Sequence, residues 1–233
     1  MLKDKTILIT GAASGLGKAW SKNFFEEGAR VFACDINEEG LTELKDLGID
    51  TQVVDVSSAA HVQSFIESAI TDTGKIDVLF NNAGMGFGHK LDSFPDGAFE
   101  HHVSVHLFGT VYGMRYALPL MQRQGYGRII NTISRNAETN VEKTSAYSAA
   151  KAAIWSATRV AANENIDHNI LINMIIPGQP IPIFGERICR IFKVQKIPIL
   201  RLDYWLALRK AGLQEKFIGT RKNILCSTRK IQS

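Results

Sequence analysis

Short runs of β-branched and apolar residues alternate with longer amphipathic stretches through the first three-quarters of the chain. The runs are typical of buried parallel strands, and they are KTILIT (5–10), ARVFACD (29–35), TQVVDV (51–56), IDVLFN (76–81), GRIINTIS (127–134) and NILINMI (169–175). The stretches between them have a helical period, at roughly 15–28, 38–47, 58–73, 97–123 and 145–165. This alternation predicts an α/β fold with a doubly wound parallel β-sheet and helices on both faces.

The alternation stops after Pro177-Gly178. Residues 179–233 show neither strand-like runs nor a strand–turn–helix order, and only 203–217 has a weak helical period. The charge changes at the same point. Residues 1–178 carry 15 Lys+Arg and 20 Asp+Glu, a net charge of −5, whereas residues 179–233 carry 12 and 3, a net charge of +9. We therefore expect one folded domain over 1–178 and an aberrant basic tail over 179–233.

Composition places the chain among ordinary globular proteins. It has 233 residues, of which 45% are hydrophobic and 21% charged, enough for one α/β domain with a buried core. The three cysteines, Cys34, Cys189 and Cys226, form no close-spaced pair, which argues against a disulfide framework or a zinc site. With no signal peptide or membrane-length apolar run, we expect a cytoplasmic protein that does not enter a membrane.

A glycine-rich turn follows the first strand and opens into a helix. Its sequence is Thr10-Gly11-Ala12-Ala13-Ser14-Gly15-Leu16-Gly17. Gly11 permits the tight turn, Gly15 lets the backbone approach a pyrophosphate, and Gly17 allows close packing of helix and strand. The amides at the start of the helix then face the phosphates. A turn without a ligand is the alternative, but the spacing between strand and helix favours dinucleotide binding.

Tyr147 and Lys151 are one helical turn apart, on the same face of a predicted helix. An ammonium beside a phenol favours the phenolate, so the pair can transfer a proton to or from a substrate oxygen. Such a pair on its own is often only a solvated helix face. Ser134 changes this interpretation, because it ends the preceding strand, where ligands bind in open parallel sheets.

Taken together, these motifs resemble the single-domain branch of the short-chain dehydrogenase/reductase (SDR) family over residues 5–178. The glycine spacing, the Asn81-Asn82-Ala83-Gly84 stretch, the set of Ser134, Tyr147 and Lys151, and Pro177-Gly178 all match. The resemblance implies a Rossmann-type fold. It implies that Ser134 polarises the substrate oxygen, that Tyr147 is the general acid/base, and that Lys151 assists Tyr147 and holds the nicotinamide ribose.

The same resemblance implies a set of cofactor-binding residues. They are Gly11, Ser14, Gly15, Leu16, Gly17, Asp35, Asp55, Val56, Asn82, Ala83, Gly84, Tyr147, Lys151, Pro177 and Gly178. In the family, Asp55 and the next backbone amide meet the adenine, while Asn82 to Gly84 line the ribose. For Asn81, bracing of the sheet and contact with the ligand are both open.

Asp35 bears on the choice of cofactor. It closes the second strand, 24 residues after Gly11, where a carboxylate accepts hydrogen bonds from the adenosine ribose and repels the extra phosphate of NADP. No Lys or Arg in Ala12–Leu16 or directly after Asp35 offsets that repulsion. We therefore expect NAD, with NADP as the lesser alternative.

His106 departs from the family pattern. It stands in the sequence Val105-His106-Leu107-Phe108-Gly109, where relatives often have an Asn that bonds backbone and holds a water in a proton relay. We count His106 among the catalytic residues and, because imidazole titrates near neutrality, expect reduced activity or a shifted pH profile. His102 and His106 also have metal-ligand spacing, but without a nearby third ligand we expect no metal.

The tail is explained by a change of reading frame. When residues 179–182 are back-translated and shifted by one base, they give T-N-T after a restored proline, and residues 213–226 give T-G-K-V-Y-W-D-E-K-E-Y-P-L. The family has P-G-x-x-x-T and a late T-G-K-aromatic strand in these places. The sequence therefore predicts a one-nucleotide deletion at the Gly178–Gln179 junction, so that the tail replaces the substrate lid and the last strand.

The leading interpretation is an NAD(H)-dependent oxidoreductase that interconverts a secondary alcohol and a carbonyl on a small molecule, with Tyr147 as general acid/base. One alternative is a nucleotide-binding SDR-like protein with weak or no catalysis, which His106 and the tail favour. A nucleic-acid-binding protein that uses the basic tail is the other, but aromatic interleaving and a known module are missing. By analogy with relatives, we expect a homodimer or homotetramer; the substrate is open.

Overall fold

The computed structural model describes residues 2–86, 88–139 and 141–177. The chain divides into two compact units, Met1–Met174 and Ile175–Ser233. Of the second unit, the structure describes only Ile175–Pro177. The predicted tail 179–233 thus lies outside the described residues, and the fold below is that of the first unit together with the last residue of its final strand.

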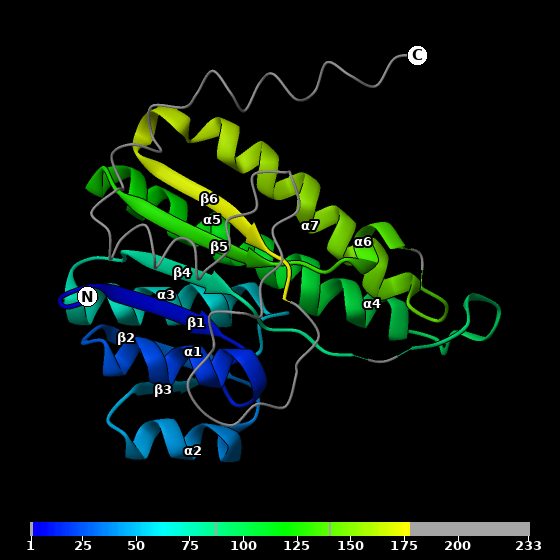
Figure 1. Cartoon of the computed structure of the whole chain (residues 1–233), viewed down its shortest axis with the longest axis horizontal. Helices are drawn as coiled ribbons and strands as arrows, with labels where there is room; N and C mark the ends of the chain where they lie inside the picture. The colour runs from blue at the N-terminus through cyan, green and yellow to red at the C-terminus, as the bar shows by residue number, and fades with distance from the viewer. Residues whose placement is uncertain (1, 87, 140, 178–233) are drawn as a thin grey trace. The chain divides into compact units, whose positions relative to one another are not determined.

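Six strands form one sheet in the order β3-β2-β1-β4-β5-β6 (Figure 1). Strand β1 pairs in parallel with β2 and β4, β2 with β3, and β4 with β5. The strands are β1 (Thr6–Thr10), β2 (Arg30–Asp35), β3 (Asp50–Val53), β4 (Val78–Asn81), β5 (Gly127–Thr132) and β6 (Ile170–Ile175). The chain starts in the middle of the sheet and winds outward in both directions. Strand order therefore reverses between β1 and β4, where such sheets bind ligands.

Helices cover both faces of this sheet, as the sequence predicted (Figure 1). Helix α1 contacts α2, and α3 contacts α5, which contacts α7 in turn. The helices are α1 (Gly15–Glu26), α2 (Glu38–Asp46), α3 (Ala59–Thr73), α4 (Ala98–Val103), α5 (Gly109–Gln124), α6 (Asn136–Thr139) and α7 (Ser145–Glu164). Short segments are η1 (Leu91–Ser93), the π-helical η2 (Ser104–Phe108) and η3 (Ile166–His168). No helix of the described residues is long and apolar enough to span a membrane.

The central strands are buried because both of their faces carry apolar side chains. All five residues of β1 and all four of β4 are buried. Phe80 of β4 packs against the rings of Trp20 and Phe24 from α1, at centroid distances of 5.5 and 5.2 Å. This packing fixes α1 over the middle of the sheet, so that the turn before α1 lies beside the carboxyl end of β4.

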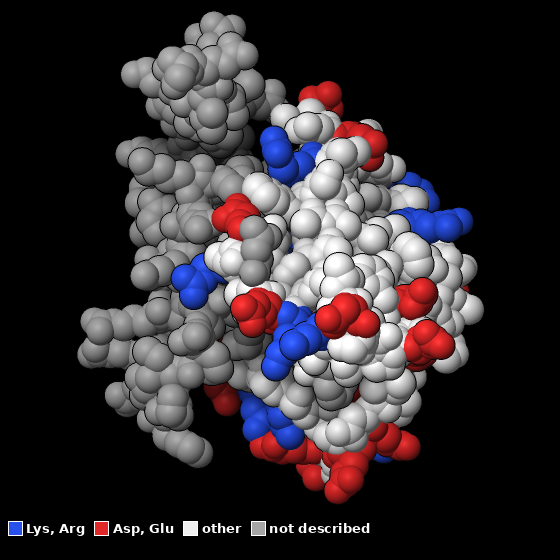
Figure 2. Space-filling view, turned by 90° about the vertical axis from the view of Figure 1, so that its right-hand side faces the viewer, with Lys and Arg blue, Asp and Glu red and all other residues white. Residues whose placement is uncertain are grey.

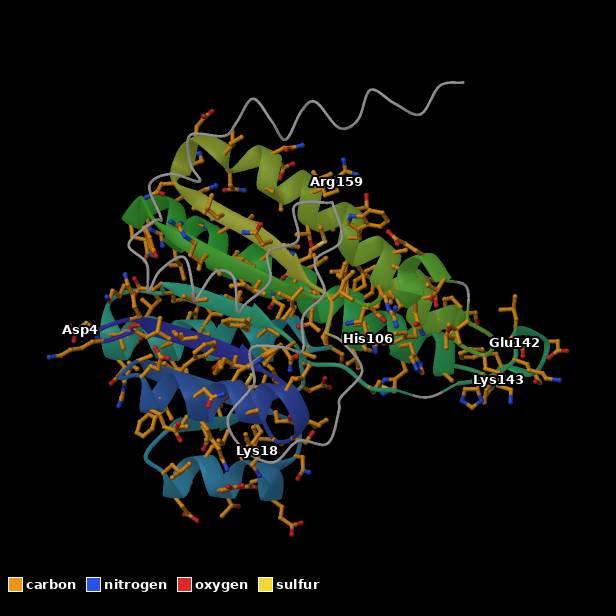
Figure 3. All side chains as sticks on the ribbon, viewed as in Figure 1. Asp4, Lys18, His106, Glu142, Lys143 and Arg159 are labelled. Carbon is orange, nitrogen blue, oxygen red and sulfur yellow. The ribbon has the colours of Figure 1, made fainter. Side chains whose placement is uncertain are left out.

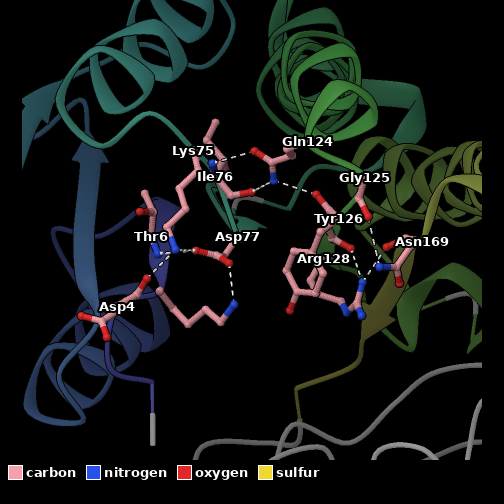
Figure 4. A network of polar contacts seen from close by, with 12 residues as sticks. Asp4, Thr6, Lys75, Ile76, Asp77, Gln124, Gly125, Tyr126, Arg128 and Asn169 are labelled. Atoms are coloured by element: carbon pink, nitrogen blue, oxygen red, sulfur yellow. Dashed lines mark hydrogen bonds and ion pairs between the residues drawn. The ribbon is translucent and has the colours of Figure 1, made fainter.

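A polar network joins the strands at their amino ends (Figure 4). Asp77, directly before β4, accepts hydrogen bonds from Lys5 Nζ at 2.7 Å and from the Thr6 amide at 2.9 Å, and pairs with Lys75 Nζ at 3.0 Å. Burial opposes ionisation of Asp77, but these hydrogen bonds outweigh it and lower its pKa. Figure 3 shows Asp4 at this edge and His106 towards the opposite edge, where the strands end. Structural anchoring and the candidate site thus occupy opposite ends of the strands.

Several predicted strand ends differ from the structure. The third strand was expected at 51–56, but β3 ends at Val53, so Asp55 and Val56 lie in the loop beyond it. The fifth strand was expected at 127–134, but β5 ends at Thr132, so Ser134 lies beyond the strand and not at its end. The helix expected at 97–123 is helical from Ala98 to Gln124, as α4, η2 and α5 in succession, with a π-helical turn around His106.

Candidate active site

The glycine turn between β1 and α1 combines two glycines with positive φ angles and close packing at a third. Gly11 and Gly15 have φ angles of +70° and +53°, which favour glycine. A Cβ at Gly17 would overlap the carbonyl oxygen of Gly11, whereas a Cβ at Gly15 would have no atom of the described residues within 4 Å. Gly17 therefore serves the packing of the turn, and Gly15 leaves space beside it. Ser14 caps α1 without a side-chain hydrogen bond to the helix.

Thr10 fixes the backbone after β4 against this turn. Its Oγ1 accepts hydrogen bonds from the backbone amides of Asn82 and Ala83, both at 3.0 Å. The Asn82 side chain donates in return to the carbonyl oxygens of Thr10 and Gly11, at 3.1 and 3.3 Å. In the sequence, Thr10 is only the first residue of the glycine motif. In the structure, it joins the end of β1 to the backbone that follows β4.

Asn81 braces the sheet. Its side chain is buried and donates to Asn131 Oδ1 of β5 at 2.8 Å, and Asn131 donates to Thr158 Oγ1 of α7 at the same distance. A Cβ at Gly113 would overlap the Asn81 amide, so α5 approaches this network closely. Of the two roles left open for Asn81, the structure supports the bracing one.

Asp35 lies at the carboxyl end of β2, beside the glycine turn. One of its carboxylate oxygens accepts a hydrogen bond from the Ala13 amide, and the other accepts from the Asn37 amide, both at 3.0 Å. Both oxygens are therefore held in place by backbone. Asp55 is held locally instead, since its Oδ1 accepts from the Ser57 amide and hydroxyl at 2.9 and 2.7 Å. Hydrogen bonds from Ser57 hold the pKa of Asp55 below its ordinary value, although burial opposes this.

Tyr147 and Lys151 share the first turns of α7, and the structure brings them together with β5. Lys151 is 4% exposed, and its Nζ lies 5.6 Å from the centroid of the Tyr147 ring. The ammonium donates to the carbonyl oxygen of Thr132, the last residue of β5, at 2.7 Å. Burial lowers the pKa of Lys151 to about 7. Thr132 was not among the predicted residues, because a backbone acceptor leaves no signal in a sequence.

Ser134 follows β5 two residues after Thr132. Its hydroxyl accepts a hydrogen bond from the Asn136 amide at 3.2 Å, at the start of α6. Lys151 is hydrogen-bonded to Thr132 at the end of β5. Ser134 therefore lies on the segment that follows this contact. The sequence also predicted Pro177 and Gly178 as cofactor-binding residues. Pro177 follows β6, and Gly178 lies outside the described residues.

His106 contacts Tyr147 directly. The two rings are nearly perpendicular, at 84°, with centroids 5.1 Å apart. On the other side, the His106 ring stacks with His102 at 6.1 Å. The expectation that His106 titrates near neutrality is wrong: burial, followed by the nearby Lys151, lowers its pKa to about 3. The imidazole is therefore neutral at ordinary pH.

Within residues 2–86, 88–139 and 141–177, no three His, Cys, Asp or Glu side chains are grouped as metal ligands. His102 and His106 have the spacing of a ligand pair, and one ring nitrogen of each contacts a backbone oxygen. His102 Nδ1 lies 2.9 Å from Ala98 O, and His106 Nε2 lies 2.9 Å from Met85 O. Figure 2 views the side towards which the strands point, where uncharged side chains predominate among scattered acidic and basic ones.

Comparison with known proteins decides the family. Residues 5–180 match the model of the short chain dehydrogenases. The chain belongs to the short-chain dehydrogenase family. Levodione reductase of Leifsonia aquatica is 36% identical over 184 residues, which are 75% of this chain and 69% of that protein. An uncharacterized oxidoreductase of Schizosaccharomyces pombe, C922.06, is 36% identical over 216 residues, 92% of this chain and 81% of its own.

A solved structure agrees with the sequence relatives. The crystal structure of an NAD+-bound xylitol dehydrogenase superposes with a TM-score of 0.72 at 32% identity, covering 78% of this chain and 73% of that one. The predicted family and the Rossmann-type doubly wound fold are thus confirmed. As a short-chain dehydrogenase, this protein is an oxidoreductase.

Proposed function

We propose that this short-chain dehydrogenase interconverts a secondary alcohol and a carbonyl with NAD(H), and that Tyr147 is its general acid/base. One observation carries the proposal. Tyr147, Lys151 and His106 meet in one cluster, with Lys151 bonded to the end of β5, in a sheet whose first turn is shaped for a dinucleotide. The levodione reductase and xylitol dehydrogenase relatives support the same class of reaction.

The described residues fit a dinucleotide cofactor. The open space at Gly15 and the uncapped amides at the start of α1 suit a pyrophosphate. Asp35 suits the adenosine ribose of NAD, because its carboxylate is fixed at the turn by Ala13 and Asn37. That fixed negative charge disfavours the additional phosphate of NADP. The relative with NAD+ bound supports the choice of NAD for this chain.

Asp55, Val56 and the stretch Asn82–Gly84 belong to the proposed cofactor site. The backbone of Asn82 and Ala83 is tied to Thr10 directly beside the glycine turn. The loop that carries Asp55 follows β3, on the side of the sheet where β2 ends at Asp35. These positions agree with a cofactor that extends along the carboxyl ends of the strands.

The chain's own groups account for the proton transfer. The nicotinamide, when bound, accepts or supplies the hydride. Tyr147 transfers a proton to or from the substrate oxygen, which the Ser134 hydroxyl holds and polarises. The ammonium of Lys151, 5.6 Å from the phenol ring, stabilises negative charge on Tyr147 and binds the nicotinamide ribose. Burial lowers the pKa of Lys151 to about 7, so the charged form that makes this interaction predominates below that pH.

Replacement of Tyr147 by Phe tests the function. We expect turnover of a panel of secondary alcohols with NAD to fall by a factor of about 10²–10⁴, because the proton-transfer group is lost. NAD binding, measured by calorimetry, should change little, and the parent should turn over faster with NAD than with NADP. Tyr116→Phe on α5 is the matched control. Equal turnover of Tyr147→Phe and parent, with NAD still bound, would instead indicate a nucleotide-binding protein without this catalysis.

We also propose that residues 179–233 are encoded in a shifted frame. The family model ends its match at residue 180, two residues after the junction at which the pattern and the charge change. Levodione reductase is likewise covered only to 69% of its length. In this view, the basic tail replaces the segment that would supply the substrate lid and the last strand. The identity of the substrate is therefore left open.

A further inference from the structure

The His106 side chain meets the backbone of Met85 with a single atom. Its Nε2 lies 2.9 Å from the Met85 carbonyl oxygen and 3.2 Å from the Met85 amide nitrogen. A ring nitrogen either donates through its hydrogen or accepts through its lone pair, and cannot do both. The imidazole therefore makes one of the two hydrogen bonds and leaves the other backbone group without its partner on the ring.

The surroundings select the tautomer. His106 is 2% exposed, and its Nδ1 is buried without a hydrogen-bond partner among the described residues. A hydrogen on Nδ1 would be buried with no acceptor, within the field of the Lys151 ammonium, which also disfavours a positive ring. With the hydrogen on Nε2, the shorter contact becomes a hydrogen bond to Met85 O, the Met85 amide loses Nε2 as its acceptor, and Nδ1 carries only a lone pair.

The polypeptide is shaped to bring this ring against the strand end. The π-helical turn η2 carries His106, and a Cβ at Gly84 would lie 2.5 Å from His106 Cε1 and 2.8 Å from its Nδ1. Only glycine at position 84 lets the imidazole lie along the backbone of residues 84 and 85. Helical turns of this wide kind are often found at functional sites.

We propose that His106 is a positioning residue. Its imidazole donates a hydrogen bond from Nε2 to the Met85 carbonyl oxygen, and so fixes the backbone directly after the proposed cofactor-binding residues Asn82–Gly84. The proposal rests on the proposed function, and it gives His106, which the sequence placed among the catalytic residues, a positioning role. Residues 82 and 83 are held by Thr10, and His106 holds residue 85. The segment after β4 is thus held at both ends. The Tyr147 ring packs against His106, with the two ring planes nearly perpendicular.

Among the described residues, the titratable groups that face the ring do not change this assignment. Lys151 faces His106 from α7 and His102 from α4, and both disfavour a proton on it, as does burial. The hydrogen bond to Met85 favours the proton but is the lesser influence. The pKa of about 3 keeps the ring neutral over the working pH range of an enzyme.

Glutamine is the informative replacement. The end of its amide reaches about as far from Cβ as Nε2 of histidine, and it offers both a donor and an acceptor. His106→Gln can therefore bond both the carbonyl and the amide of Met85, whereas His106→Leu can bond neither. A general acid/base role would be lost in both variants, but a positioning role would be lost only in the second.

The first experiment reads the tautomer of the full chain without an assay. ¹⁵N-histidine labelling and long-range ¹H–¹⁵N NMR at pH 7, with His106→Gln to assign the signals, should show a protonated Nε2 and an unprotonated Nδ1 at residue 106. A hydrogen on Nδ1, or an imidazolium, would overturn the proposal. This result is independent of turnover, so failure of the proposed function would appear separately, as equal activity of Tyr147→Phe and parent.

The second experiment uses turnover of secondary alcohols with NAD. We expect His106→Gln to keep kcat/KM within about threefold and to keep the pH profile, while His106→Leu loses about 10- to 100-fold through misplacement of the site. Thermal melts show whether the Leu variant is folded, and the Gln variant keeps the test decisive if it is not. Loss of a limb of the pH profile in His106→Gln would show acid–base catalysis and contradict the positioning role.

Discussion

The glycines of the first turn differ in what they do, although the sequence gives them one motif. Gly17 has no room for a Cβ, because the Gly11 carbonyl oxygen lies against it. Gly15 has ample room but a φ of +53°, so a side chain there is strained without any clash. The contact at Gly17 agrees with a role in packing the helix against the turn. The space at Gly15 agrees with the role proposed for it, the approach of a ligand.

Paired alanine substitutions test this difference. Gly17→Ala should destabilise the fold by several kcal/mol, because the new methyl group displaces the turn from α1. Gly15→Ala should cost only about 1 kcal/mol, from its backbone angle, yet weaken NAD binding by at least tenfold, since the methyl occupies the approach of the pyrophosphate. Urea unfolding and calorimetric titration with NAD measure the two effects. A Gly15→Ala protein that binds NAD as tightly as the parent would refute the assignment of that space.

At the level of elements, the buried Lys151 joins α7 to β5 and is costly to the fold. Its hydrogen bond to Thr132 secures the helix to the strand, but burial lowers its pKa from the ordinary 10.5 to about 7. Between these two values the unfolded chain binds more protons than the folded chain, so stability rises with pH. Below about pH 7 the full cost of the buried ammonium is present, and by pH 10.5 it has disappeared.

Lys151→Met should therefore stabilise the protein while removing activity. At pH 6.5 we expect the free energy of unfolding to rise by about 1–3 kcal/mol, because an apolar chain of similar length replaces a buried charge. The gain should shrink steadily towards pH 10. Urea unfolding at several pH values measures it, with the exposed Lys45→Met on α2 as the control. If Lys151→Met were less stable than the parent at every pH, the hydrogen bond to Thr132 would outweigh the cost of burial.

Pattern and spacing predicted the elements well where local sequence decides them. Each expected strand is present, and the glycine turn, Asp35 and the Tyr147–Lys151 turn lie where the motifs placed them. The π-helical turn was not predicted; in the structure it carries His106, which contacts the backbone of Met85, 21 residues away. The environment of His106 was not predicted either, since its low pKa comes from burial and from Lys151 on another helix. Contacts between distant segments leave no periodic signal.

At the scale of the whole molecule, the sequence up to residue 178 and the tail differ in pattern and in charge. Over residues 5–180 the chain matches its family, and the sheet order, glycine turn and Tyr147 cluster are consistent with one another. Agreement at every level is what natural sequences show. The tail has a net charge of +9 and no such pattern. The alignment with the Schizosaccharomyces pombe protein covers 92% of this chain and so extends into the tail, which is the observation that opposes a shifted frame.

Resequencing the gene across codons 175–182 tests the shifted frame. We expect one additional nucleotide at the Gly178–Gln179 junction, which restores P-G-P-T-N-T and turns the downstream Arg-Ile and Lys-Ile pairs into acidic residues. A protein expressed from the restored gene should melt at higher temperature than the present chain, because it would gain a last strand that pairs at an edge of the sheet. Both proteins should be melted with and without NAD. An intact frame that encodes residues 179–233 as written would end the proposal, and the basic tail would then belong to the working enzyme.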